Sequence, residues 1–480
     1  MKFLESVHRR TNWGRESGST RMMLILGGVA VLVIVLAVLR GGPSRSSGTA
    51  GGGGNASETA GSSGGGSGGG SGMEPRKPRL ASQSGSGGQG QTGPAAVVAD
   101  KVIEFSRGRR DLIERLAGRL NVPVPPEVDE FFSAVEKGDW SGIKSMFHAV
   151  STQAGAAGAP EGLAALLPAI RETYAVAEAK EAWPADELLA YGQTVLASLK
   201  PGMVYVGESR WGSAIPALLN ETSGEGRAVL LDQSMLSDPG YVEYLGMMYG
   251  DRISALSKDD TERAQSGYLA RLKERARDNQ LRPGETAPTG DSPGIGSAGA
   301  EEVAQSLMLA LLYKNPGMTV AMEKPEPGSP FYDLATPMGP IFEVRSPAAA
   351  GGGTEGAKTT TTPAQAEESA NYWRETAAQI QALPESEATL NRRRSMADMA
   401  IAQANMLANR SLGGPAEQTF RSAIDIAPMA IEPVSELAKY LQGAGRGNEA
   451  QQVFNDYLAR NPGKEQEVEL IRSRLAGTGR

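Results

Sequence analysis

Two short polar stretches hold the residues best suited to chemistry, and each directly follows an apolar run. Gly207–Trp211 (GESRW) comes after Met203–Val206 (MVYV), and Asp232–Ser234 (DQS) comes after Ala228–Leu231 (AVLL). If both runs are parallel strands, the polar stretches lie outside their carboxyl ends, where open α/β sheets bind ligands. The sequence therefore predicts a site for a sugar or another small polar ligand. Its candidate residues are Glu208, Ser209, Arg210, Trp211, Asp232 and Gln233.

These side chains have distinct expected roles. Glu208 and Arg210 can form an ion pair and contact a polar ligand, and Trp211 can stack on the flat face of a sugar. The alternative interpretation is ordinary loop polarity, in which Ser209 or Asp232 caps the helix that follows.

The composition excludes several kinds of active site. The chain has no cysteine, so disulfides, thiolate metal sites and cysteine nucleophiles are excluded. Its two histidines are His8 and His148, and a zinc site built on a histidine pair is not expected. His148 is expected to be an ordinary helix residue. We predict no catalytic residue, metal or cofactor, although an enzyme whose carboxylates meet only on folding stays an open alternative.

Two glycine patterns are similar to nucleotide-binding motifs. Gly202–Ser209 has the spacing of a phosphate-binding loop, but Glu208 stands where that loop has lysine, which reverses the charge. Gly294–Gly299 matches G-x-G-x-x-G, but the residues before it are typical of a loop rather than a strand. Neither pattern predicts nucleotide binding.

The elements around the polar stretches alternate between strands and helices, which indicates an α/β unit with a largely parallel sheet at 200–345. We expect four strands, at Met203–Val206, Ala228–Leu231, Met318–Met322 and Ile341–Val344. The helices expected between them are Ala214–Asn220, Gly240–Tyr249, Thr261–Gln280 and Glu301–Tyr313.

A helical region precedes this unit, at 96–199. Ala96–Leu120 has apolar residues at helical spacing and is followed by Pro123, Pro125 and Pro126, which cannot continue a helix. Glu127–Lys137, the Gly-Asp turn and Trp140–Val150 then predict a helical hairpin.

The middle unit resembles the soluble part of bacterial multi-pass membrane proteins related to protein O-mannosyltransferases. The resemblance is carried by Gly202–Asn220, Ala228 onward to Tyr249–Ile253 (YGDRI), and Leu311–Met322. It implies a soluble sensing or binding domain linked to cell-envelope glycans or protein glycosylation. It implies no membrane-embedded transfer site, because this chain has one apolar span rather than many.

The last part of the chain repeats with a period of 34 residues. Ala416, Phe420, Ala423 and Pro428 recur as Ala450, Phe454, Tyr457 and Pro462. This pattern resembles two tetratricopeptide repeats at 397–430 and 431–464, with Glu465–Leu475 as a capping helix and Asn371–Leu383 as a helix on the other side. Gln403 and Tyr457 depart from the pattern. The resemblance implies an α-solenoid that binds protein partners, and Asn405 and Asn409 are the candidate partner-binding residues.

Met22–Leu39 has eighteen residues without a charge and predicts one transmembrane helix. More basic residues precede it than follow closely, which places the N-terminus in the cytoplasm and the bulk outside. A cleaved signal peptide is the alternative. The expected segments are a tail at 1–21, the span at 22–39, a Gly/Ser-rich disordered linker at 40–95, the helical region at 96–199, the α/β domain at 200–345, a low-complexity linker at 346–366 and the repeats at 367–480.

The charge distribution bears on the partners. The net charge is −7, and residues 1–40 carry six basic and two acidic residues, which leaves −11 on the rest. An acidic chain lacks the basic surface that nucleic acids require. The sequence therefore predicts a mainly α-helical, single-pass membrane protein that acts as an extracytoplasmic scaffold, with a sugar-binding or polar-ligand-binding domain as the alternative function.

Overall fold

The computed structural model describes residues 93–156, 162–224, 228–287, 295–345, 360–383 and 389–477. The predicted transmembrane helix Met22–Leu39 lies outside these residues, as does the predicted Gly/Ser-rich linker at 40–95 up to residue 92. The last residues of that predicted linker belong to a helix that begins at Pro94. Within the described ranges, no helix combines the length and the apolar character needed to cross a bilayer.

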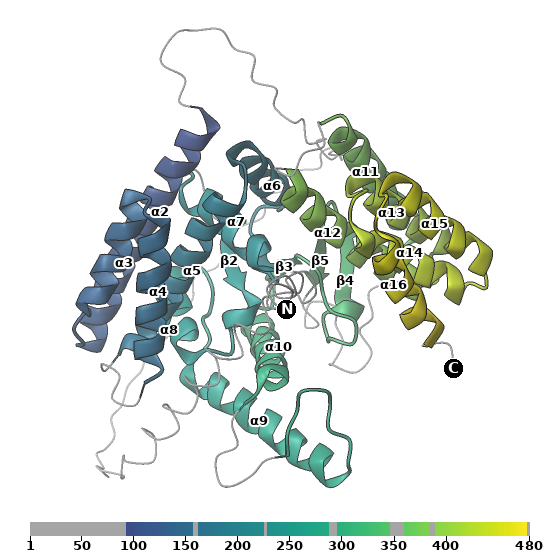
Figure 1. The fold of residues 1–480 in the computed structure, drawn as a ribbon. Helices are drawn as coiled ribbons and strands as arrows, with labels where there is room; N and C mark the ends of the chain where they lie inside the picture. The colour runs from purple at the N-terminus through teal and green to yellow at the C-terminus, as the bar shows by residue number, and fades with distance from the viewer. Residues whose placement is uncertain are drawn as a thin grey trace, which may run out of the picture.

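The described chain is mostly helical and contains one small mixed sheet between two groups of helices (Figure 1). The amino-terminal group is α2 (Pro94–Leu120), α3 (Pro126–Lys137), α4 (Trp140–Ala154), α5 (Leu163–Ala182) and α6 (Ala185–Ala197). The carboxy-terminal group is α11 (Pro363–Gln381), α12 (Leu390–Asn409), α13 (Gly413–Ile426), α14 (Ile431–Gly443), α15 (Gly447–Arg460) and α16 (Glu465–Gly477).

The middle of the chain supplies the sheet and the helices between its strands. The strands are β1 (Val204–Gly207), β2 (Val229–Asp232), β3 (Thr319–Met322), β4 (Ala335–Met338) and β5 (Ile341–Arg345). The connecting elements are α7 (Arg210–Glu221), the short η1 (Gln233–Met235), α8 (Pro239–Tyr249), α9 (Lys258–Arg277), α10 (Ser297–Lys314) and the short η2 (Tyr332–Leu334).

The sheet is only half parallel, which corrects the prediction of a largely parallel sheet. Its strand order is β2-β1-β3-β5-β4. β1 pairs in parallel with both β2 and β3, whereas β3–β5 and β5–β4 are antiparallel. The described residues form five strands rather than four, because Ala335–Met338 adds an edge strand. Pro337 lies in that strand. Proline has no backbone N–H to donate, and an edge strand tolerates this because no strand pairs with its outer side.

One hydrophobic core joins the amino-terminal helices to the sheet. It runs from Val98 in α2 through the strands to Ala430, which follows α13. α5 packs against α2 of its own group and against α7 and α8 of the middle part of the chain. The amino-terminal helices therefore pack directly on the helices that connect the strands. A smaller cluster lies under α14–α16 and includes Val434, Leu437 and Phe454. α9 and α10 form a further cluster around Tyr268 and Leu307.

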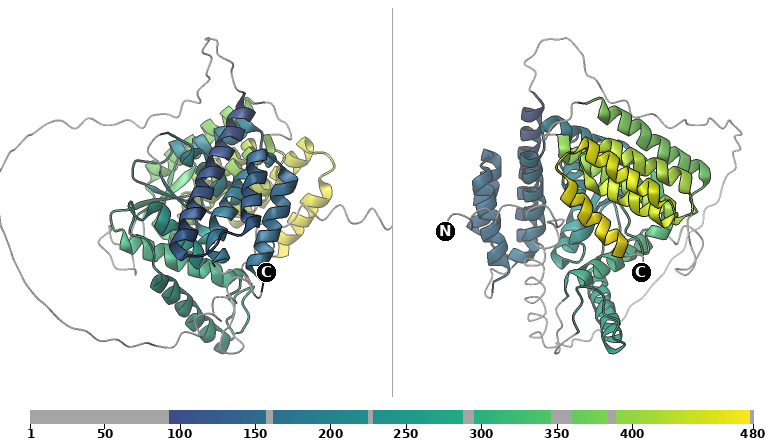
Figure 2. Two further views of the ribbon diagram at one scale, coloured as in Figure 1. Left: turned by 90° about the vertical axis from the view of Figure 1, so that its left-hand side faces the viewer. Right: turned by 45° about the vertical axis from the view of Figure 1, so that its right-hand side comes forward.

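The carboxy-terminal helices lie side by side in Figure 1 and in the right-hand view of Figure 2. The closest neighbours along this stack are the pairs α12–α13, α11–α13 and α14–α15. α13 and α15 begin at Gly413 and Gly447. α11 begins at Pro363, eight residues before the predicted start at Asn371.

The side-chain amide of Gln403 links this stack to the sheet. Gln403 of α12 is fully buried. Its Oε1 accepts hydrogen bonds from the Ser369 hydroxyl (2.7 Å) and the Trp373 indole N–H (2.8 Å). Its Nε2 donates to the carbonyl oxygens of Gly339 (2.9 Å) and Ile341 (3.0 Å). Gln403, which departs from the repeat pattern, therefore connects α11 and α12 to the β4–β5 hairpin.

Candidate functional site

The carboxyl ends of β1 and β3 form the best candidate site, which we call the strand-end site. β1 leads through Gly207 and Glu208 directly into α7. Ser209 caps this helix, because its hydroxyl accepts a hydrogen bond from the Gly212 N–H at 2.9 Å. β1 lies between β2 on one side and β3 on the other. The site is therefore at the point where the strand order reverses.

A carboxylate of the chain itself occupies the N-terminus of α7. Glu323 follows β3 and is almost fully buried. Its Oε2 accepts hydrogen bonds from the backbone N–H groups of Glu208 (2.9 Å) and Ser209 (2.7 Å). Its Oε1 accepts one from the Ser209 hydroxyl (2.5 Å). Phosphate-binding α/β folds offer such donors to phosphate, whereas here the Glu323 carboxylate accepts them.

The close contact with Glu323 explains a glycine. A side-chain carbon at Gly212 would overlap the Glu323 carboxylate. The glycine therefore allows the first turn of α7 to approach the acid, and the carboxylate compensates the positive end of the helix dipole.

Glu208 lies beside Glu323, and its carboxylate lacks hydrogen-bond partners that Glu323 has. Burial raises the pKa of Glu208 well above its usual value, and the nearby charges of Glu323 and Glu326 raise it further. Its Oε1 is shielded from solvent and has no hydrogen-bond partner among the described residues.

Arg210 and Trp211 turn away from Glu208 and toward the amino-terminal helices. The Arg210 guanidinium pairs with Glu178 of α5 rather than with Glu208. It also lies 5.4 Å from the Trp211 ring, and that ring packs edge-on against Trp183 at 6.3 Å. Part of the Trp211 ring surface therefore contacts other residues of the chain.

Asp232 and Gln233 reach the same edge of the sheet from β2, where Asp232 pairs in register with Gly207. Asp232 acts as a cap, since its Oδ1 accepts hydrogen bonds from the Ser234 N–H (2.9 Å) and hydroxyl (2.6 Å). Burial raises the pKa of Asp232 to about 6. Gln233 is buried, and its Oε1 has no hydrogen-bond partner among the described residues.

The sequence interpretation missed Glu323, which follows β3 and fills the N-terminus of α7. Glu326 also follows β3, Glu301 lies in the second turn of α10, and Tyr191 comes from α6. The rule applied to β1 and β2 could have identified Glu323, because it also directly follows a parallel strand. Glu301 shares a hydrogen bond with Glu326, which with burial raises the pKa of Glu301 to about 7.

The candidate partner-binding residues lie on α12 and have different surroundings. The Asn409 amide donates a hydrogen bond to the Tyr332 hydroxyl at 2.7 Å, so it contacts η2 of the same chain. Asn405 is half-buried one turn earlier. His148, as expected for an ordinary helix residue, is exposed on α4.

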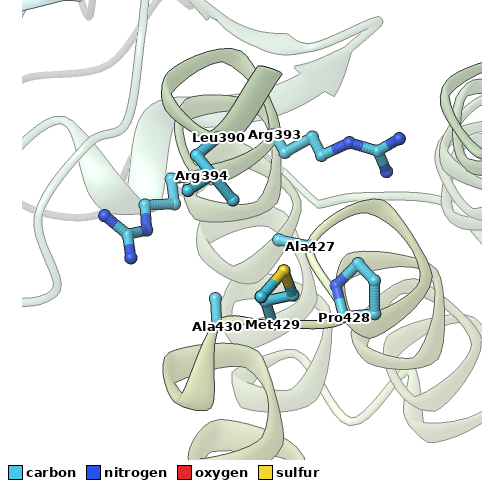
Figure 3. A pocket seen from close by; sticks show the side chains of 7 residues that line it. All are labelled: Leu390, Arg393, Arg394, Ala427, Pro428, Met429 and Ala430. Carbon is cyan, nitrogen blue, oxygen red and sulfur yellow. The ribbon is translucent and has the colours of Figure 1, made fainter. Parts of the chain in front are cut away.

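Two small cavities lie away from this site. One, of about 10 Å³, is lined by Arg393, Arg394, Pro428 and Met429 between α12 and the start of α14, and it has room for about one water molecule (Figure 3). The other, of about 150 Å³, lies among α2, α3, α4 and α5, and Ala99, Val102 and Ile143 contribute to its lining. The described residues contain no group of three or more acidic or histidine side chains arranged to hold a metal ion.

No protein-family model matches the chain, and no curated protein or solved structure is significantly similar to it.

Proposed function

We propose that the protein is a membrane-anchored, extracytoplasmic scaffold that binds protein partners through its carboxy-terminal helices, with tetratricopeptide-like packing. The register of two helical hairpins carries this proposal. α13 runs from Gly413 to Ile426 and α15 from Gly447 to Arg460, so both bounds recur 34 residues later. The repeated positions Ala416, Phe420 and Ala423, and Ala450, Phe454 and Tyr457, are all buried. Such a stack packs through nearest neighbours and leaves an extended surface for partners.

The second hairpin offers more free surface than the first. α12 of the first hairpin faces the molecule itself, through Gln403 and the buried Arg392–Glu187 ion pair (2.8 Å). One period after Asn405 lies Lys439 on α14, which is exposed and only loosely paired with Glu436 at 3.6 Å. We therefore assign partner binding to α14 around Lys439.

Site-specific photo-crosslinking in native membranes tests this assignment. A crosslinking side chain at Lys439 is expected to label one defined protein. The same side chain at Asp456, exposed on α15, is the matched control and is expected to label none. Equal labelling from both positions, or none from Lys439, would contradict the proposal.

The membrane anchor is proposed from Met22–Leu39. Its apolar length supports one span, and the basic residues before it support a cytoplasmic N-terminus. Partition of the intact chain into detergent, with protease accessibility only from the outer side, is the expected result. A mature chain that begins after residue 40 would contradict it.

A second candidate function, the binding of a small polar ligand at the strand-end site, is favoured by two buried oxygens. Neither Glu208 Oε1 nor the Tyr191 hydroxyl has a hydrogen-bond partner among the described residues. Buried polar atoms are normally hydrogen-bonded, so each unsatisfied one suggests a missing partner such as a ligand. A thermal-shift screen of sugars and amino compounds tests this function, and a failure of every compound to shift the melting temperature would contradict it.

A further inference from the structure

The amino-terminal helices enclose the larger of the two cavities, of about 150 Å³, which we call the helix-ring cavity. α2 packs on α3, α3 on α4, α4 on α5 and α5 on α2, so the four helices form a closed ring. The cavity lies at one end of this ring, where the first part of α2 meets the end of α3 and the second half of α5. Close-packed protein interiors contain few voids larger than one water molecule, so a space of this volume can hold a ligand.

Small residues in the wall create this space. The neighbouring helices α2 and α5 each contribute an alanine to it, Ala99 and Ala177. Gly138, at the end of α3, has a φ of 68°, a left-handed conformation that favours glycine. The α3–α4 turn therefore adds no side chain to the lining, and a carbon atom built on Gly138 would have no neighbour within 4 Å.

The floor of the helix-ring cavity is apolar and buried. Four of its side chains are no more than 3% exposed: Val102, Val135, Ile143 and Ala177. These side chains offer no hydrogen bond to a water molecule. An apolar cavity of about this volume has room for one benzene ring. The floor therefore suits a compact apolar group of about six carbon atoms.

The mouth of the cavity carries two charges of each sign. Lys180 donates a hydrogen bond to Glu181 Oε1 at 3.0 Å, so these two charges compensate each other. Glu136 and Lys137 also line the cavity, and neither forms an ion pair within the described part of the chain. A hydroxyl group suits this mouth, because it can accept a hydrogen bond from an ammonium group and donate one to a carboxylate. A charged ligand would lose hydration there without a net opposite charge to compensate it.

We propose that the helix-ring cavity binds a compact neutral alcohol, whose ring of about six carbon atoms occupies the apolar floor and whose hydroxyl lies at the mouth beside Glu136 and Lys137. This site is separate from the strand-end site and from the carboxy-terminal helices. The inference therefore goes beyond both proposed functions, and its failure would leave the crosslinking at Lys439 unaffected.

A fluorine NMR titration of 4-fluorobenzyl alcohol with the purified full-length chain in detergent tests the proposal. We expect saturable binding that unlabelled benzyl alcohol reverses. 4-Fluorobenzoate and 4-fluorobenzylamine carry a charge at neutral pH and are expected to bind at least fivefold more weakly. Absence of saturable binding would overturn the proposal. Equal or tighter binding of either charged compound would reject the neutral ligand class.

Two variants locate the binding in the cavity. Ala99→Leu fills part of the space and is expected to weaken the binding of 4-fluorobenzyl alcohol at least tenfold. Ala95→Leu, exposed one turn earlier on α2, is the matched control and should leave the affinity unchanged. All variants are compared in the same detergent, so partition of the probe into micelles is equal. Unchanged affinity in Ala99→Leu, or equal losses in both variants, would overturn the proposal. Should Ala99→Leu not fold, Ala177→Val decides on the same criterion.

A change of charge at the mouth provides an independent test. Lys137→Gln leaves a net negative charge among the four charged residues of the mouth. The ratio of 4-fluorobenzylamine affinity to 4-fluorobenzoate affinity should then rise at least threefold. Lys273→Gln, an exposed position on α9, is the control and should not change this ratio. An unchanged ratio in Lys137→Gln would show that the polar end of the ligand does not lie at this mouth, which would overturn the proposed binding mode.

Discussion

At the scale of single residues, Arg109 is the most consequential charge in the amino-terminal helices. It is buried on α2, and its Nε donates a hydrogen bond to Glu172 Oε2 of α5 at 2.9 Å. The same carboxylate accepts a hydrogen bond from the Tyr244 hydroxyl of α8. The guanidinium also lies 4.3 Å from the centre of the Phe105 ring. One side chain therefore links three helices.

Replacement of this arginine should be strongly destabilising. Arg109→Met would leave the Glu172 carboxylate in a poorly hydrated site without its cation, and such losses cost about 3–5 kcal/mol. Arg110→Met is the matched control, because its partner Asp129 is largely exposed and exposed pairs contribute less than about 1 kcal/mol. Urea unfolding of both variants measures the difference. Equal losses of stability would show that the buried pair has no special role.

Asp232 gives a prediction in pH. Its folded-state pKa of about 6 lies above the ordinary 3.8, so the native state binds the proton more tightly than the unfolded state does. Stability from this group is therefore highest below about pH 4 and is lost as the pH rises through 6. Asp232→Asn, which keeps an acceptor for Ser234, should stabilise the fold at pH 8 by about 1–2 kcal/mol, allowing for partial exposure, and have little effect at pH 4. Thermal melts at both pH values check this, with exposed Asp456→Asn as control.

At the scale of elements, the sequence predicted the parts that depend on local pattern. The ends of β1 and β2, to within one residue, and the 34-residue spacing of α13 and α15 follow from short-range periodicity and turn residues. α7 begins at Arg210, four residues before the predicted Ala214, because Ser209 caps it. β4 was missed because Ala-Thr-Pro-Met has neither alternation nor apolar bulk. The contact of Glu323 with the N-terminus of α7 joins residues more than one hundred positions apart, and no local pattern indicates it.

The four hydrogen bonds of the Gln403 amide, which we call the Gln403 joint, connect α11 and α12 to the β4–β5 hairpin and should contribute strongly to stability. Gln403→Leu would remove four hydrogen bonds and leave the Trp373 N–H, the Ser369 hydroxyl and the Gly339 carbonyl oxygen without the partner that Gln403 provides. Each such group costs about 1–3 kcal/mol, so we expect a loss of about 3–5 kcal/mol after relaxation. Asn405→Leu, two residues further along α12, is the control and should cost less than about 1 kcal/mol. Chemical unfolding that is equally affected in both variants would contradict the assigned role.

The 150 Å³ cavity among the amino-terminal helices predicts a gain of stability. Ala99 of α2 contributes to its wall, so Ala99→Leu should fill part of the space and raise the free energy of unfolding by about 1–2 kcal/mol. Ala95→Leu, exposed one turn earlier, has no cavity to fill and should be neutral. A lower melting temperature for Ala99→Leu alone would show that the walls cannot accept the larger side chain.

At the scale of the whole molecule, the core does not follow the segments that composition suggests. The predicted low-complexity linker at 346–366 ends within α11, which begins at Pro363. α11 and α12 contribute Trp373, Met396 and Met399 to the same core as the strands. The helices after Ala430 depend mainly on their own cluster, which reaches the rest through Ala404 and Phe420. Composition identifies a low-complexity segment, but it does not indicate which helices and strands pack together on either side of that segment.

Truncation at two points distinguishes these units. A chain that ends at Ala430 keeps the Gln403 joint and loses the packing of α14 on Ala404 and Phe420, so it should remain folded with a melting temperature lowered by roughly 5–10 °C. A chain that ends at residue 359 uncovers the β4–β5 hairpin and the Glu187 carboxylate that pairs with Arg392. Because this removes both apolar contacts and a buried ion pair, the shorter chain should aggregate or lose cooperative unfolding. Circular dichroism melts and gel filtration compare the two, and a cooperative, monomeric chain ending at residue 359 would show that the sheet and the amino-terminal helices form a core that does not need α11 and α12.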